Sequence, residues 1–231
     1  MIPLRDINRS SRFPVVVIGL IVLNGLAWLY ELSLGHQLRR FFFLFGVVPS
    51  FYFDPDYWET TGLIVGVLPL FISMFLHGGW LHFLGNMLYL WVFGDNVEDR
   101  LGHFRFLVFY LVCGLAAAAL HILTNSGSRV PTVGASGAIA GVLGAYMILF
   151  PRARVLTLVP IFFFFQLMEL PALIFIGIWF IMQFFSGAFA LTVGAGGNMG
   201  GTAWWAHIGG FIMGIILVLR YRRRVRRVYT I

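Results

Sequence analysis

Polar residues at the starts of apolar segments have the types that acyl transfer requires. Ser136 offers a hydroxyl, which is a weak nucleophile until a base removes its proton. His207 offers an imidazole, whose pKa suits a general base near neutral pH. His82 and Asn86 are four residues apart in HFLGN, so they share one helical face and could donate hydrogen bonds to an oxyanion. The sequence therefore indicates a serine-type site in which Ser136 and His207 react as a pair.

Small residues would let the segments that carry the serine and the histidine approach closely. The first segment reads GASGAIAGVLGAY, with Gly134 and Gly137 on either side of the serine. The second reads HIGGFIMG, in which Gly210 and Gly214 form a GxxxG pattern typical of closely packed membrane helices. We expect these segments to form neighbouring helices, which would bring the hydroxyl within reach of the imidazole. Neither segment contains an acidic residue, so we expect a dyad whose histidine is oriented by packing.

Composition indicates that lipid is the main solvent of this chain. Of its 231 residues, 60% are apolar and 11% are charged, whereas about a quarter are charged in soluble domains. A membrane span needs about 20 helical residues, so this length holds several spans and no large soluble domain. We expect one integral membrane domain over residues 1–231.

Apolar runs of spanning length predict an all-α, polytopic bundle of six transmembrane helices. They lie near residues 13–34, 81–98, 104–124, 134–150, 168–190 and 203–220. Two further apolar stretches are not counted as spans. The stretch at residues 61–76 contains two glycines and a proline. The stretch at residues 155–166 is too short for a span and also contains a proline. Residues 35–80 are then expected to form a long outer loop.

The positions of the arginines predict the orientation of these helices. All 16 cationic residues are arginine and give a net charge of +7, but they flank apolar runs and form no patch beside aromatic residues, which argues against nucleic acid binding. They gather at residues 5–12, 100–105, 152–154 and 220–227. Six spans place all four clusters on one side, which the positive-inside rule makes cytoplasmic. We expect residues 1–12 and the basic tail 221–231 in the cytoplasm, and the protein in the inner (plasma) membrane of a bacterium.

Four motifs in order resemble the rhomboid family of intramembrane serine proteases. They are HGGWLHFLGN, FGDNVEDRLGHFRF, GASGAIAG and AHIGGFIMG, and the agreement runs from about Met74 to Gly214. The resemblance implies a six-helix rhomboid-like bundle with its core at about residues 67–220, and cleavage of the transmembrane segments of membrane-protein substrates. It implies no metal and no other cofactor. Glu98 and Arg100 in VEDRLG match a family motif that is structural and not catalytic.

The resemblance also implies roles for the polar residues singled out above. Ser136 would be the nucleophile and His207 the general base, while His82 and Asn86 would line the oxyanion site. The cavity would open to the outer side, and gating would occur near the fifth helix and the glycine-rich outer loop at residues 192–202.

Two features depart from the family pattern. The Trp-Arg pair that many members have before the position of His77 is absent. We expect His77 itself to lie in a loop at the membrane interface. Ala140 stands where some members have an aromatic residue that stacks beneath the catalytic histidine, so Trp204 or Trp205 is a candidate for that ring. Neither departure removes a reacting group.

Other classes of protein fit the sequence less well. A zinc protease would need a motif such as HExxH, which is absent. Glu169, near the start of the fifth predicted helix, could mark a transport site, but an interfacial carboxylate explains it more simply. A non-catalytic relative that binds membrane clients remains the alternative, although such relatives normally lack the serine or the histidine.

Overall fold

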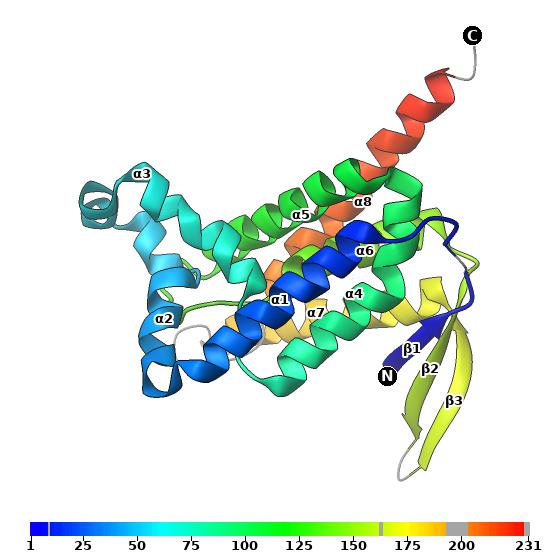
Figure 1. The fold of residues 1–231 in the computed structure, drawn as a ribbon, viewed down its shortest axis with the longest axis horizontal. Coiled ribbons are helices and arrows are strands. Elements are labelled where there is room, and N and C mark those ends of the chain that lie inside the picture. The colour runs from blue at the N-terminus through cyan, green and yellow to red at the C-terminus, as the bar shows by residue number, and fades with distance from the viewer. Residues whose placement is uncertain (9, 162–163, 193–202, 229–231) are drawn as a thin grey trace.

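The structure is a computed structural model that describes residues 1–8, 10–161, 164–192 and 203–228. The protein is a mostly helical membrane protein (Figure 1). Its helices are α1 (Val15–Ser33), α2 (Leu38–Phe45), α3 (Pro55–Ile72), α4 (Trp80–Leu101), α5 (His103–Thr124), α6 (Ser136–Leu149), α7 (Ala172–Thr192) and α8 (Trp204–Val228). Short 3₁₀ helices cover Gly35–Gln37, Pro49–Phe53 and Ser73–Phe75.

A three-stranded antiparallel sheet corrects the prediction of an all-α fold. Its strands are β1 (Ile2–Asp6), β2 (Arg154–Ile161) and β3 (Phe164–Pro171), in the order β1-β2-β3. The apolar stretch at residues 155–166 is thus neither a span nor a loop but most of a β-hairpin, favoured by its β-branched and aromatic residues. The fifth predicted helix starts at Ala172 and not at 168, because residues 164–171 pair with β2.

The structure also changes the count of spans. Five helices among the described residues are long and apolar enough to cross a membrane. They are Val15–Ser33, Pro55–Phe75, His103–Thr124, Ala172–Phe189 and Trp204–Tyr221. Two of the six predicted spans do not qualify: α6 has only 14 residues, and α4 is long enough but carries polar residues that lower its hydropathy.

The segment that contains α3 was predicted to be part of a loop, and it forms a helix of spanning length instead. Gly62 has a φ of 69° and a ψ of 165°, which interrupts the helix. Residues 63–72 beyond this kink measure about 15 Å, half the thickness of a bilayer core. Gly62, one of the residues that argued against a span in the sequence, therefore does interrupt the helix. Helical residues nevertheless continue on both sides of it.

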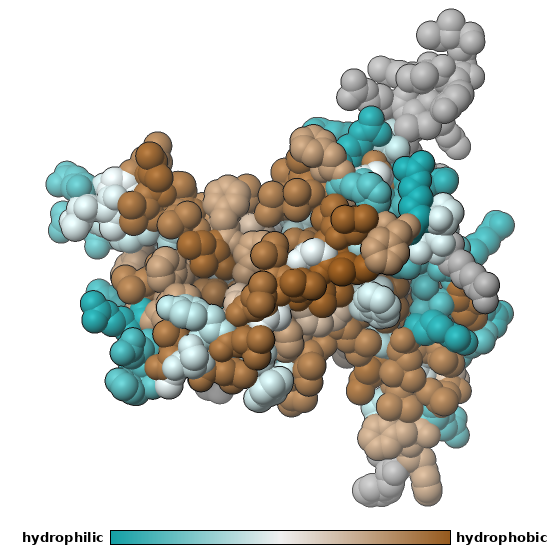
Figure 2. All heavy atoms as spheres, viewed as in Figure 1, coloured by the Kyte–Doolittle hydropathy of each residue, from teal (hydrophilic) through white to brown (hydrophobic). Residues whose placement is uncertain are grey.

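Apolar side chains cover the sides of the bundle, and hydrophilic residues gather at its two ends (Figure 2). Leu63, Leu81 and Leu123 are each more than two thirds exposed in the structure without lipid. Such exposure would be costly in water, and it is the surface expected of a protein that lipid surrounds.

The short helix α6 lies in the middle of the bundle against α4, α5 and α8 (Figure 1). Every residue from Gly137 to Tyr146 is buried. Its small residues allow backbone contact with α8: a Cβ added at Gly210 would overlap the carbonyl oxygen of Gly137, and one added at Gly214 would overlap that of Gly141. This close approach fixes the position of α6 relative to α8.

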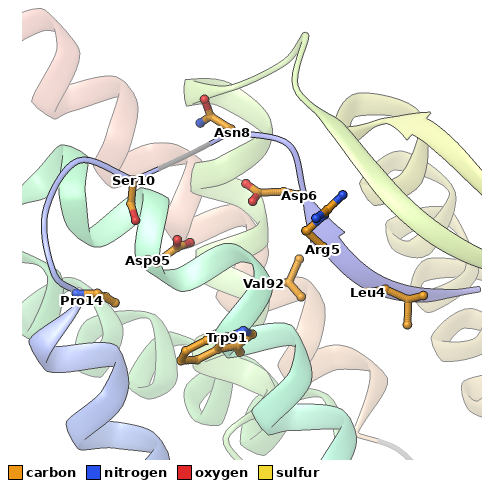
Figure 3. A pocket seen from close by; sticks show the side chains of 9 residues that line it. All are labelled: Leu4, Arg5, Asp6, Asn8, Ser10, Pro14, Trp91, Val92 and Asp95. Carbon is orange, nitrogen blue, oxygen red and sulfur yellow. The ribbon is translucent and has the colours of Figure 1, made fainter.

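The N-terminal residues form an arm across the end of α4. Asp6 accepts hydrogen bonds from Tyr146 Oη at 2.6 Å and from Asn96 Nδ2 at 2.8 Å. A pocket of about 430 Å³ separates the arm from α4, and the side chains of Asp6 and Asp95 both lie at it (Figure 3). These contacts join the arm to both α4 and α6.

We expect the attachment of this arm to weaken as pH rises. Burial is the main cause that raises the pKa of the Asp6 carboxyl from 3.8 to about 6, and repulsion from Asp95 adds to it, while the hydrogen bond from Tyr146 opposes it. The folded protein therefore binds this proton more tightly than the unfolded chain does. The stability that this proton provides is present below pH 3.8 and is lost as pH rises through about 6.

The measurement is the thermal unfolding midpoint of the protein in detergent, for the wild type and for Asp6→Asn, on both sides of that pH window. We expect the midpoint of the wild type to fall relative to that of the variant as pH rises. Parallel curves for the two proteins would show that Asp6 does not carry the effect.

Candidate active site

Ser136 is the first residue of α6, and the residues before it enter the bundle in a conformation that only glycine adopts readily. Gly134 has a φ of 140° and its N–H donates to the carbonyl of Ser73 at 2.8 Å. A Cβ at Gly134 would lie within 2.7 Å of His82 Nε2. The absence of a side chain at this position therefore lets the imidazole of His82 lie beside the start of α6.

His207 lies in the first turn of α8, and its imidazole faces the hydroxyl of Ser136. The distance from His207 Nε2 to Ser136 Oγ is 2.8 Å, although 71 positions separate the residues in the sequence. His207 is buried, being only 7% exposed. The structure thus brings together the two residues that the sequence suggested as a reacting pair, and the glycine contacts between α6 and α8 determine their separation.

Gln183 of α7 binds the other nitrogen of the same imidazole, which the sequence analysis did not foresee. Its Oε1 lies 2.7 Å from His207 Nδ1, and the side chain is buried. With Oε1 as the acceptor, Nδ1 carries the proton and Nε2 presents its lone pair to Ser136. His207 is therefore oriented by a hydrogen bond and not by packing alone. The signal in the sequence was a single amide side chain in an apolar span without charges.

The ring beside the imidazole also differs from expectation. Trp179 of α7 lies with its ring centroid 5.8 Å from that of His207, at an interplanar angle of 36°. In the described part of the chain, this is the aromatic ring that pairs with His207, and neither Trp204 nor Trp205 takes that place. The aromatic residue that is missing at Ala140 is thus replaced from α7, one turn before Gln183.

His82 and Asn86 lie on α4 and line the same cavity as Ser136 and His207. The cavity has a volume of about 1370 Å³ and an apolar wall that includes Trp204. Asn86 is 7% exposed, and its Nδ2 has no hydrogen-bond acceptor among the described residues. A buried donor without a partner is costly, and one that lines a cavity is available to a bound group.

His77 corrects the expectation of an interfacial loop residue. It is completely buried, and its backbone N–H donates to the carboxylate of Glu31 at 3.0 Å. Its ring lies edge-on to that of His82, with the centroids 5.2 Å apart. Glu31, at the end of α1, thus holds the turn that precedes α4, a role that the sequence analysis missed.

These residues together can perform nucleophilic acyl transfer. A hydroxyl faces an imidazole nitrogen, a buried amide donor has no acceptor among the described residues, and a cavity adjoins both.

The comparison with protein families decides which group of proteins this arrangement belongs to. The family model of the Rhomboid domain matches residues 62–224, more than half of the chain. The chain belongs to the rhomboid family. The matched residues include four polar residues that line the cavity, namely His82, Asn86, Ser136 and His207.

This rhomboid is similar to curated proteins of several eukaryotes. It is 38% identical to "RHOMBOID-like protein 5" of Arabidopsis thaliana over 78 residues, which are 34% of this chain and 25% of that protein. It is 30% identical to "Rhomboid protein 1, mitochondrial" of Saccharomyces cerevisiae over 165 residues, 70% of this chain and 42% of that one. It is 34% identical to "Presenilin-associated rhomboid-like protein A, mitochondrial" of Danio rerio over 100 residues, which are 42% of this chain and 26% of that protein. The match spans less than half of each relative.

In this rhomboid the VEDRLG motif lies at the far end of α4 from the cavity. The carboxylate of Glu98 accepts hydrogen bonds from the N–H groups of Val16 at 2.9 Å and Val17 at 2.8 Å, and so caps the start of α1. Arg100 is exposed, and its carbonyl oxygen accepts a hydrogen bond from Tyr221 of α8 at 3.3 Å. Both residues join helices and do not line the cavity.

Proposed function

We propose that this rhomboid is an intramembrane serine endopeptidase that cleaves the transmembrane segments of membrane-protein substrates. The observation that carries the proposal is the 2.8 Å distance between Ser136 Oγ and His207 Nε2 inside a protein with five candidate spans. Membership of the rhomboid family supports the same reaction class.

In the first half of the reaction, His207 Nε2 takes the proton of Ser136 and Oγ attacks the scissile carbonyl carbon. The negative charge that develops on the carbonyl oxygen needs preorganised donors. Asn86 Nδ2 can supply one, the imidazole of His82 another, and the backbone N–H of Ser136 a third, because the first N–H of a helix has no acceptor within it. The tetrahedral intermediate collapses to an acyl-enzyme when the protonated His207 gives its proton to the departing amine.

The second half of the reaction releases the acyl group. A water molecule in the cavity gives a proton to His207 Nε2, and its oxygen attacks the ester carbonyl. Collapse of this second intermediate returns the proton to Ser136 Oγ and frees the carboxyl product. The cavity volume of about 1370 Å³ leaves room for both a peptide segment and water. No step uses a metal or another cofactor.

We assign Gln183 as a positioning residue for His207. Replacement by leucine removes the acceptor for Nδ1–H, so the imidazole loses both its preferred tautomer and its orientation. We expect Gln183→Leu to lower kcat about tenfold to a hundredfold, the usual effect of losing a partner that orients a functional group. KM should change little, because Gln183 is not among the residues that line the cavity.

The conservative variant Gln183→Glu serves as the matched control, because it keeps an acceptor at the same place. It should recover part of the kcat that Gln183→Leu loses. Equal losses in both variants would argue that the side chain only fills space between α7 and α8.

The membrane orientation follows from the arginines. We propose that α4 and α6 cross the membrane packed against their neighbours, and that α3, interrupted at Gly62, does not cross it. Both ends of the chain then lie in the cytoplasm, and the cavity opens toward the outer side of a bacterial plasma membrane. The arginine clusters then lie at the cytoplasmic ends of α4, α6 and α8, while the turn between α5 and α6 is outside.

Access of the substrate is expected from the side of α7. This helix supplies Trp179 and Gln183 to the site, and much of the rest of its surface faces outward. The glycine-rich loop, named above as the second candidate for the gate, lies outside the described residues from position 193 on. Substrates with small side chains at the cut and helix-breaking residues nearby are what the family resemblance implies.

The test is cleavage of a model transmembrane substrate by the protein in proteoliposomes, with a fluorophosphonate probe and a chelator as parallel arms. We expect cleavage that the chelator leaves unchanged, and covalent labelling that mass spectrometry locates at Ser136. Binding of the substrate without cleavage and without labelling would favour the client-binding alternative. Loss of cleavage with the chelator would contradict a serine mechanism.

A further inference from the structure

The hairpin formed by β2 and β3 exposes apolar side chains on both of its faces. The exposed fractions are 74% for Phe164, 69% for Phe165, 62% for Leu167 and 39% for Met168. Successive residues of a strand point to opposite faces, so the two phenylalanines extend from opposite sides of the hairpin. A sheet that lay in water would alternate apolar and polar residues. This pattern favours an apolar environment around residues 164–168, which lie next to the tip.

Charged residues lie at the root of the hairpin and not at its tip. Arg154 begins β2 and forms an ion pair with Glu169 of β3, with an N–O distance of 3.8 Å. Arg152 is exposed in the turn just before β2. In β3 the only other polar side chain is Gln166. The hairpin is therefore cationic where it leaves the bundle and apolar where it ends.

The hairpin starts at the membrane boundary. β3 ends at Pro171 and the spanning helix α7 begins at the next residue, Ala172. Figure 1 shows the sheet at the end of the bundle, with the hairpin extending away from the helices and across the direction of α7. In Figure 2 most of the coloured surface of this projection is apolar, with smaller hydrophilic patches beside it.

We propose that this hairpin binds the lipid leaflet next to the start of α7, with the tip among the acyl chains and the root arginines at anionic headgroups. The apolar tip calls for a surface that can surround both faces, which a leaflet does and a single flat protein surface does not. The cationic root matches the negative surface of the cytoplasmic leaflet. Amphipathic helices in the interface bury their apolar faces about 5–10 Å into the boundary between headgroups and chains, and we expect a similar depth for this hairpin.

Anchoring of the hairpin would also restrain α7. Because β3 continues directly into α7, the position of the hairpin in the leaflet sets the depth and tilt of that helix. The proposal does not depend on the proposed proteolysis, since lipid contact can be measured in a catalytically inactive protein.

The test uses the full chain in liposomes, with a nitroxide attached to a single cysteine and Cys113 replaced by alanine. The label at Phe165→Cys is compared with one at Leu26→Cys, exposed on the middle of α1, and one at Ser126→Cys, exposed in the turn after α5. The measured quantities are the collision rates of each label with oxygen, which dissolves in lipid, and with a water-soluble nickel complex. Liposomes with and without anionic lipid form the two arms.

We expect the label at position 165 to behave as the one at position 26, with frequent oxygen collisions and few nickel collisions. Its depth should be greater in the anionic liposomes than in the neutral ones. Nickel collisions as frequent as those at position 126 would place the tip in water and overturn the proposal. Protection from both reagents would show that a protein surface covers the tip, which would also overturn it. The thermal unfolding midpoint of each labelled protein verifies that the fold is retained.

Discussion

Ser136→Ala is expected to abolish cleavage of the model substrate while the protein remains folded. The variant keeps the cavity and His207 but has no nucleophile, and removal of a triad serine costs on the order of 10⁴- to 10⁶-fold in kcat in serine proteases. The measurement is the rate of product formation in proteoliposomes at saturating substrate. Substrate binding should be retained, because the hydroxyl contributes little to it.

His207→Ala is the companion to this variant, because the two residues act as one unit. We expect a loss of similar size, and we expect the double variant to be no worse than either single one. Residual activity of Ser136→Ala close to that of the wild type would reject the assignment of the nucleophile. A fully additive double variant would reject the pairing of the two residues.

Gly210→Leu is expected to have the largest effect on stability. A Cβ at Gly210 would occupy the place of the Gly137 carbonyl oxygen, so α8 must move away from α6. Overpacking of a core typically costs about 1–3 kcal/mol when side chains can adjust. Here the obstacle is backbone, so the loss should exceed about 4 kcal/mol. Activity should disappear as well, because the same displacement separates His207 from Ser136.

The measurement is the free energy of unfolding in detergent, together with proteolytic activity. Gly19→Leu is the matched control, because Gly19 is also a helical glycine of a predicted span but nothing lies within 4 Å of a Cβ built there. We expect that control to stay within about 0.5 kcal/mol of the wild type. A similar loss in both variants would mean that the effect comes from replacing any helical glycine and not from the contact between α6 and α8.

The sequence predicted which polar residues lie together better than it predicted the elements around them. The proximity of Ser136 and His207 could be predicted because polar groups are costly in lipid and small residues surround them. Gln183 was missed because one amide side chain in an apolar span gives no spacing from which a partner can be inferred. Only the packing of α7 against α8 shows that it reaches His207 Nδ1.

The errors in the fold have a common cause. Hydropathy over a window measures composition, and it does not distinguish a helix from a strand when the stretch is short and apolar. Residues 155–166 were therefore excluded as a span without being recognised as a hairpin. In α4 the polar residues His82, Asn86 and Asn96 lower the hydropathy of a helix that packs against α1, α5 and α6. The apolar run at residues 81–98 nevertheless predicted this helix, which covers Trp80–Leu101.

The backbone contact between α6 and α8 limits which parts of this protein can change in sequence or position. Because glycines hold these helices together, Ser136 Oγ and His207 Nε2 belong to one closely packed unit. In the proposed reaction, a substrate that entered by separating α6 from α8 would also separate Ser136 from His207. We therefore expect the surrounding segments to control substrate entry and substrate selectivity. These segments can change in sequence or position without moving Ser136 relative to His207. The molecule thus combines a fixed pair of helices, α6 and α8, with variable segments around them. A change of substrate preference should be sought in those surrounding segments.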